Sequence, residues 1–150
     1  MRFDERIEVK ANTTEVWSFL WDVERVAKCL PGCQEVRVLE PQKKYAVVIM
    51  ERVGPFKARF DNTVDVLEMD EANLRVKIQA VGNDKKLGAS TRTELTVKLE
   101  ELATGGTSVD VVAEIQVIGK IASLGQVVIR RKAQDVVKKF AQAISQELEP

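Results

Sequence analysis

The chain has 150 residues, with 23 basic and 23 acidic side chains and no histidine. At this length about 68–70% of the unfolded surface can be buried, so we expect one domain, 1–150, with a substantial core. The formal net charge of zero gives nucleic-acid binding no overall electrostatic support. The lack of histidine excludes Ser-His-Asp and Cys-His catalysis and the zinc sites that use histidine.

No targeting or spanning segment is visible in the sequence. No apolar run follows Met1 and Arg2, so no signal peptide is indicated. No stretch approaches the ~20 apolar residues that a membrane-spanning helix needs. We therefore expect a soluble, cytoplasmic protein.

The first thirty residues predict one strand and two short helices. Residues 3–10 alternate apolar and charged side chains, which is typical of a strand. Asn12 can cap a first helix, with Glu15 three residues later as in a capping box. Asp22 can cap a second helix, which Pro31-Gly32 ends. Strand one is therefore followed directly by two short helices.

A run of strands follows without a helical interruption. The predicted ranges are 34–39, 45–53, 56–69, 74–80, 90–100 and 109–117. A turn at 53–56 separates the second from the third of these strands, and a longer loop at 82–88 separates the fourth from the fifth. Most strands carry apolar residues on one face and charged residues on the other, which indicates an antiparallel sheet with one wet side. The dry side needs a cover.

The last stretch, residues 121–148, supplies that cover as one long amphipathic helix. Its apolar stripe consists of Ile129, Ala133, Val136, Val137, Phe140, Ile144 and Leu148. The residues between them fit a wet face: Arg130, Arg131, Lys132, Gln134, Asp135, Lys138, Lys139 and Gln142. Gly125 weakens the first turns, because glycine in a helix costs roughly 1 kcal/mol against alanine.

The chain resembles the helix-grip fold of the START/Bet v 1-like (SRPBCC) superfamily, and within it the carbon monoxide dehydrogenase G-subunit family. The segments that carry the resemblance are 11–17, 29–33, 54–60 and 119–125. It implies an α+β fold in which a curved antiparallel sheet of six to seven strands surrounds the C-terminal helix. It also implies a cavity and an accessory role for a molybdenum-containing carbon monoxide dehydrogenase or related oxidoreductase at the inner membrane face. The duties that it implies include recruitment and carrying a lipid-like quinone.

The space between sheet and helix is the candidate ligand site. The residues that we expect to line it are Phe56, Phe60, Asn62, Val64, Ile78, Thr91, Thr93, Val111, Leu124 and Val128. Small residues on the inner face and three polar intruders (Asn62, Thr91 and Thr93) favour a cavity for a hydrophobic or amphiphilic molecule. The alternative is a filled core at ordinary packing density.

The expected function is non-catalytic binding, with no cofactor, metal or catalytic residue. The alternative is a small enzyme of the polyketide cyclase or hydratase type, which needs a pair of buried titrating groups. Glu5 and Glu51 are the acidic residues on otherwise apolar strands. The enzyme hypothesis requires both to lie close together in the cavity.

A basic face on the last helix is the candidate surface for an acidic partner or an anionic membrane. Its residues are Lys120, Arg130, Arg131, Lys138 and Lys139, joined by Trp21 from the aromatic cluster of the first helix. The alternative is an ordinary solvated helix face.

Cys29 and Cys33 flank a Leu-Pro-Gly turn. They are either a redox pair or half of a metal site, or simply two reduced thiols. Two thiols without histidine are a weak metal signal, so the reduced pair is favoured.

Overall fold

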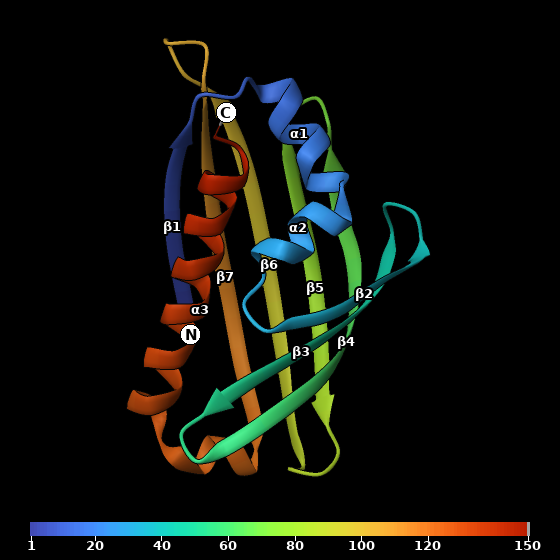
Figure 1. The fold of residues 1–150 in the computed structure, drawn as a ribbon, viewed down its shortest axis with the longest axis vertical. Coiled ribbons are helices and arrows are strands. Elements are labelled where there is room, and N and C mark those ends of the chain that lie inside the picture. The colour runs from blue at the N-terminus through green and yellow to red at the C-terminus, as the bar shows by residue number, and fades with distance from the viewer. Residues whose placement is uncertain (150) are drawn as a thin grey trace.

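The computed structural model describes residues 1–149 as one curved sheet and a set of helices (Figure 1). The strands are β1 (Arg2–Val9), β2 (Cys33–Glu40), β3 (Lys44–Val53), β4 (Phe56–Asp70), β5 (Arg75–Asp84), β6 (Ala89–Glu101) and β7 (Thr107–Gly119). The helices are α1 (Thr13–Trp21), α2 (Val23–Cys29), the 3-10 helix η1 (Lys120–Leu124) and α3 (Gln126–Glu147).

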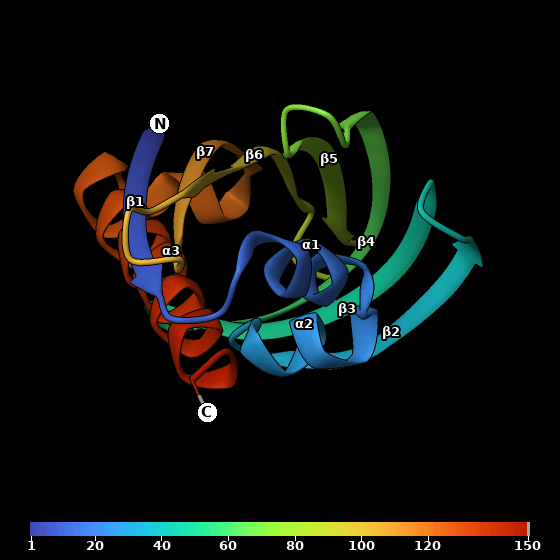
Figure 2. The same ribbon diagram turned by 90° about the horizontal axis from the view of Figure 1, so that it is seen from above.

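All seven strands form one antiparallel sheet in the order β1-β7-β6-β5-β4-β3-β2. Seen from above, the sheet curves around its inner face, with α3 beside β1 and β7, and α2 beside β2 (Figure 2). Helix α1 contacts α2 and β6. The expected α+β fold is confirmed: six to seven antiparallel strands around a C-terminal helix, with two short helices after strand one.

The helix caps predicted from the sequence are present. The Asn12 side chain accepts a hydrogen bond from the Glu15 amide at 2.9 Å, and Asp22 accepts one from the Arg25 amide at 3.4 Å. Each satisfies one of the free N–H groups in the first turn of its helix.

The predicted loop over 82–88 is partly wrong, because β5 continues to Asp84. Asn83 and Asp84 pair with Ser90 and Ala89 of β6, which leaves a short turn over 85–88. The Asp84 carboxylate accepts hydrogen bonds from the amides of Arg59 at 2.8 Å and Leu87 at 3.1 Å. The bond from Arg59 is the main reason that the pKa of Asp84 is lowered. Asp84, a residue type typical of loops, thus ends β5 and stabilises the turn that follows it.

The last helix is also shorter than predicted. Gly125 has a φ of +89°, which an α-helix cannot continue through, so residues 120–124 form the separate η1. The break lets η1 direct Ile121 into the interior, where its side chain is 1% exposed.

The core is densely packed at one end of the sheet. There α1, α2 and the C-terminal half of α3 meet the ends of β6 and β7. The largest cluster of buried residues includes Val16, Phe19, Leu99, Val109, Val111 and Ile144. Towards the other end of α3, several residues on the concave face are only half-buried. A second buried cluster, which includes Val53, Ala58, Ile121 and Ile129, closes that end, so the less filled part of the interior lies between the two clusters.

The turn between α2 and β2 depends on Gly32. Its φ is +75°, and a Cβ there would overlap the carbonyl oxygen of Met50. We expect Gly32→Ala to lower the free energy of unfolding by at least about 2 kcal/mol, through backbone strain plus the clash. Gly105→Ala is the matched control, because Gly105 has a φ of +90° but open space around it. It should cost only about 1 kcal/mol. Equal losses in urea unfolding would contradict the role given to Met50.

Candidate functional site

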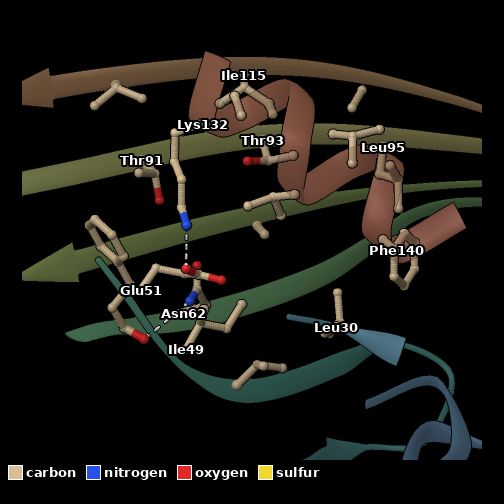
Figure 3. A pocket seen from close by; sticks show the side chains of 18 of the residues that line it. Leu30, Ile49, Glu51, Asn62, Thr91, Thr93, Leu95, Ile115, Lys132 and Phe140 are labelled. Carbon is tan, nitrogen blue, oxygen red and sulfur yellow. Dashed lines mark hydrogen bonds and ion pairs between the residues drawn. The ribbon is translucent and has the colours of Figure 1, made fainter. Parts of the chain in front are cut away.

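A cavity of about 280 Å³ lies between α3 and the concave face of the sheet (Figure 3). Strands β3 to β7 supply most of its walls, and Leu30 after α2, Ile121 of η1 and the inner side chains of α3 supply the rest. Most lining side chains are aliphatic, among them Val47, Ile49, Ala80, Leu95, Ala113 and Val136. Of the two interpretations that the sequence left open, a filled core or a hollow one, the structure has the hollow one.

Six of the ten expected ligand-binding residues line this cavity: Phe60, Asn62, Val64, Ile78, Thr91 and Thr93. Strand alternation places the three from β4 on the inner face. Register then places Asn62 level with Gly82 of β5 and Thr91 of β6. The polar intruders seen in the sequence therefore lie inside the cavity.

Four expected lining residues lie elsewhere. Val111 is 1% exposed and belongs to the densely packed end of the core. Phe56 and Leu124 pack with Val53 and Ile121, beside the turn between β3 and β4. Val128 is 39% exposed, because it lies outside the apolar stripe to which its neighbour Ile129 belongs. The alternation of apolar and polar residues predicts correctly that Val111 lies on the inner face of the sheet. It does not predict how far along the strand the cavity extends.

An ion pair spans the cavity. Lys132 Nζ lies 2.7 Å from Glu51 Oε2, with the two side chains 29% and 19% exposed (Figure 3). Glu51 points inward because it follows Val47 and Ile49 in the alternation of β3. The pair joins α3 to a strand far from it in the order of the sheet.

The prediction that Lys132 belongs to the wet face of the last helix is wrong. Lys132 lies three residues after Ile129 and four before Val136, which is the spacing of the inner stripe. The helical spacing thus indicates the inner face, although lysine side chains normally face water.

Neutral polar groups share the cavity with this pair. Asn62 Nδ2 donates a hydrogen bond to the Phe60 carbonyl at 3.2 Å. Its Oδ1 and the Thr91 hydroxyl both lie close to Gly82, where a Cβ would overlap the first and lie 2.9 Å from the second. Gly82 thus leaves room for two polar atoms on neighbouring strands.

A second cavity of about 160 Å³ lies beside α1 and α2. It shares with the first cavity the lining residues Leu30, Val47, Val64, Ile78, Leu95 and Phe140. Trp21 lines this space, and its indole N–H is buried without a hydrogen-bond partner among residues 1–149. Trp21, expected at the partner or membrane face, instead borders an internal space.

The basic residues expected at the partner face are exposed. These are Lys120, Arg130, Arg131, Lys138 and Lys139. Two of them lie close to other side chains: Lys139 pairs with Asp135 at 3.1 Å, and the Arg130 guanidinium lies 5.5 Å from the centre of the Phe3 ring. Within residues 1–149, none of the helices combines the length and hydropathy needed to cross a membrane.

The two acidic residues on apolar strands are not brought together. Glu51 lines the cavity and is paired with Lys132. Glu5 lies opposite Val111 on β1, half-buried, and is not among the residues that line the cavity. The two-carboxylate arrangement required by the enzyme alternative is therefore not formed there.

Both cysteines are free thiols. Burial raises the pKa of Cys29 from its ordinary value of 9.0 to about 11, and burial also raises that of Cys33. Both therefore carry little thiolate at neutral pH, which makes them poor nucleophiles. In the part of the chain that the structure describes, no three His, Cys, Asp or Glu side chains are grouped to hold a metal ion.

A curved sheet gripping a C-terminal helix around an apolar cavity defines the START/Bet v 1-like class of proteins. Within this class, the family model for the G subunit of carbon monoxide dehydrogenase (CoxG) matches residues 6–149, so the chain belongs to that family. No curated protein sequence matches the chain significantly.

Solved structures show the same fold at low sequence identity. A conserved protein from Geobacillus kaustophilus has a TM-score of 0.85 and 22% identity, covering 99% of this chain and 95% of that one. A START superfamily protein from Mycobacterium smegmatis has a TM-score of 0.72 and 14% identity, covering 98% and 96%. The Zhui aromatase/cyclase from Streptomyces sp. R1128 has a TM-score of 0.60 and 16% identity, covering 95% and 93%.

The ion pair across the cavity should contribute measurably to stability. In a double-mutant cycle of Glu51→Gln and Lys132→Met, we expect a coupling energy of about 1–3 kcal/mol, between the values typical of exposed and buried pairs. Asp135→Asn and Lys139→Met form the control cycle, on an exposed pair of the same helix. Its coupling should be about 0.3–0.5 kcal/mol. Equal coupling in the two cycles, measured by urea unfolding, would show that enclosure does not strengthen the inner pair.

Proposed function

We propose that the protein is a non-catalytic binding protein that holds a hydrophobic or amphiphilic molecule, of lipid or quinone type, between the sheet and α3. The observation that carries this proposal is the cavity of about 280 Å³, with apolar walls and a few polar groups. Ligand pockets of proteins start at about 300 Å³ and have this kind of lining. Because the walls of an empty cavity lack packing partners, an apolar occupant gains dispersion contacts on entry.

The arrangement of the walls suggests how such a molecule lies. Its apolar body would lie against Ile78, Leu95 and Phe140, where each Å² removed from water contributes about 25 cal/mol. Its polar end would face Glu51 and Lys132, which with Asn62, Thr91 and Thr93 are the polar residues of the lining. The cyclase or hydratase alternative has less support, because Glu51, the one acidic lining residue among residues 1–149, is already ion-paired.

Filling the cavity tests this proposal. Ala80 lies on its wall, so Ala80→Leu places extra carbon atoms in the void. We expect the affinity for the neutral fluorophore Nile red to fall by at least about tenfold, or about 1.4 kcal/mol. Val81→Leu is the control, because Val81 precedes Gly82 on the opposite face of β5 and lines neither cavity. Absence of Nile red binding to the unaltered protein, and of any co-purified apolar molecule in native mass spectrometry, would refute the proposal.

We propose further that the protein serves as an accessory or recruitment factor for a carbon monoxide dehydrogenase-type molybdenum oxidoreductase, peripheral to the inner face of the cell membrane. Membership of the CoxG family supports the partner. The exposed basic residues of α3 offer a surface for an acidic partner or anionic lipid, each cation contributing about 1 kcal/mol near such a membrane.

Charge reversal on α3 tests the docking surface. We expect Lys138→Glu with Lys139→Glu to reduce co-purification with a molybdenum-containing carbon monoxide dehydrogenase several-fold, because opposite charges attract and like charges repel. Lys85→Glu with Lys86→Glu reverses two exposed lysines in the turn between β5 and β6 and should have no effect. Undiminished capture by the α3 variant, folded as judged by circular dichroism, would move the docking site to another surface.

A further inference from the structure

We infer that the cavity selects amphiphiles with an uncharged polar head, and that Glu51 and Lys132 determine this selectivity. The inference rests on the proposed binding function and names the class of ligand. The observation behind it is the charge content of the lining. Within the described chain, Glu51 and Lys132 are the charged residues that line the cavity, and they lie 2.7 Å apart.

The walls therefore carry no net charge. The remaining lining consists of apolar side chains with the neutral amide of Asn62 and the hydroxyls of Thr91 and Thr93. A carboxylate or phosphate head would bring a net negative charge into a site of low polarity, next to the carboxylate of Glu51. An ammonium head would do the same with the opposite sign next to Lys132. Each loses hydration without gaining an unpaired counterion.

An uncharged head escapes this cost and still finds hydrogen bonds. The Lys132 ammonium has three donors and directs one at Glu51, which leaves donors for a carbonyl or hydroxyl oxygen of the ligand. The Glu51 carboxylate has further acceptor sites for a ligand hydroxyl or amide N–H. Asn62 on β4 and Thr91 on β6 add neutral polar groups to the same lining. The head site thus offers donors and acceptors while its charges cancel.

The same geometry explains why a lysine in this apolar cavity does not favour fatty acids. An unpaired Lys132 would attract a carboxylate, but Glu51 already occupies the position of its counterion. Removing one partner should therefore switch the preferred charge of the head. Glu51→Gln leaves one positive charge in the lining and favours carboxylates. Lys132→Met leaves one negative charge and favours amines.

Three straight-chain probes with the same number of carbon atoms separate these cases at neutral pH: dodecanol, laurate and dodecylamine, each measured by displacement of Nile red. The unaltered protein should bind dodecanol at least about tenfold more tightly than either charged probe, a difference of about 1.4 kcal/mol. Glu51→Gln should raise the affinity for laurate, relative to that for dodecanol, by on the order of tenfold. Lys132→Met should raise the affinity for dodecylamine, relative to that for dodecanol, by a similar factor. The double variant should again prefer dodecanol.

Lys139→Met and Asp135→Asn alter the exposed pair of α3 by the same charges and should leave the selectivity unchanged. Equal affinity of the unaltered protein for all three probes overturns the inference but leaves the binding function in place. Unchanged selectivity in both folded single variants overturns it as well. If none of the probes nor Nile red binds, the binding function itself fails. If a single variant does not fold, the preference of the unaltered protein and of the double variant still decides.

Discussion

The structure depends on one constraint: a single long helix covers the concave face of a curved sheet and is too narrow to fill all the space that the curvature encloses. Helix α3 packs mainly against β1, β7 and α2. Strands β4, β5 and β6 face it across a void. The bond between Glu51 and Lys132 bridges this gap at 2.7 Å and joins β3 to α3 (Figure 3). The cavity and the contact across it are two consequences of the same curvature.

Two closely packed clusters allow the space between them to remain hollow. Val16, Phe19 and Ile144 are at most 2% exposed and fix the C-terminal half of α3 against the sheet. Arg25 of α2 adds a bond to Glu147 at 3.0 Å near the end of α3. At the other end of α3, Gly125 separates η1 from α3, and the Ile121 side chain is buried in the interior. Close packing on both sides of the cavity thus holds α3 in place and leaves the space between for a guest.

Much of this arrangement followed from the sequence. Strict alternation identified the inner face of β4, β5 and β6, and with it the positions of Asn62, Thr91 and Thr93. Two features did not follow. Periodicity shows which face a residue takes but not where the helix diverges from the sheet, so Val111 was expected in the cavity. A lone lysine normally faces water, so the sequence predicts Lys132 on the outer face. The structure shows the carboxylate of Glu51, on a distant strand, that lets Lys132 turn inward.

The presence of an ion pair in this position calls for a reason other than stability. Replacing a buried pair by apolar side chains of similar volume is often neutral or stabilising, because two charges lose hydration when they are enclosed. An aliphatic pair at 51 and 132 would have continued the stripes of Val47 and Ile49 on β3 and of Ile129 and Val136 on α3. It would also have removed every charge from the lining. Keeping both charges retains hydrogen-bonding capacity in an apolar space while the net charge stays at zero. That combination suits recognition of a polar but uncharged group better than it suits holding the sheet to its helix.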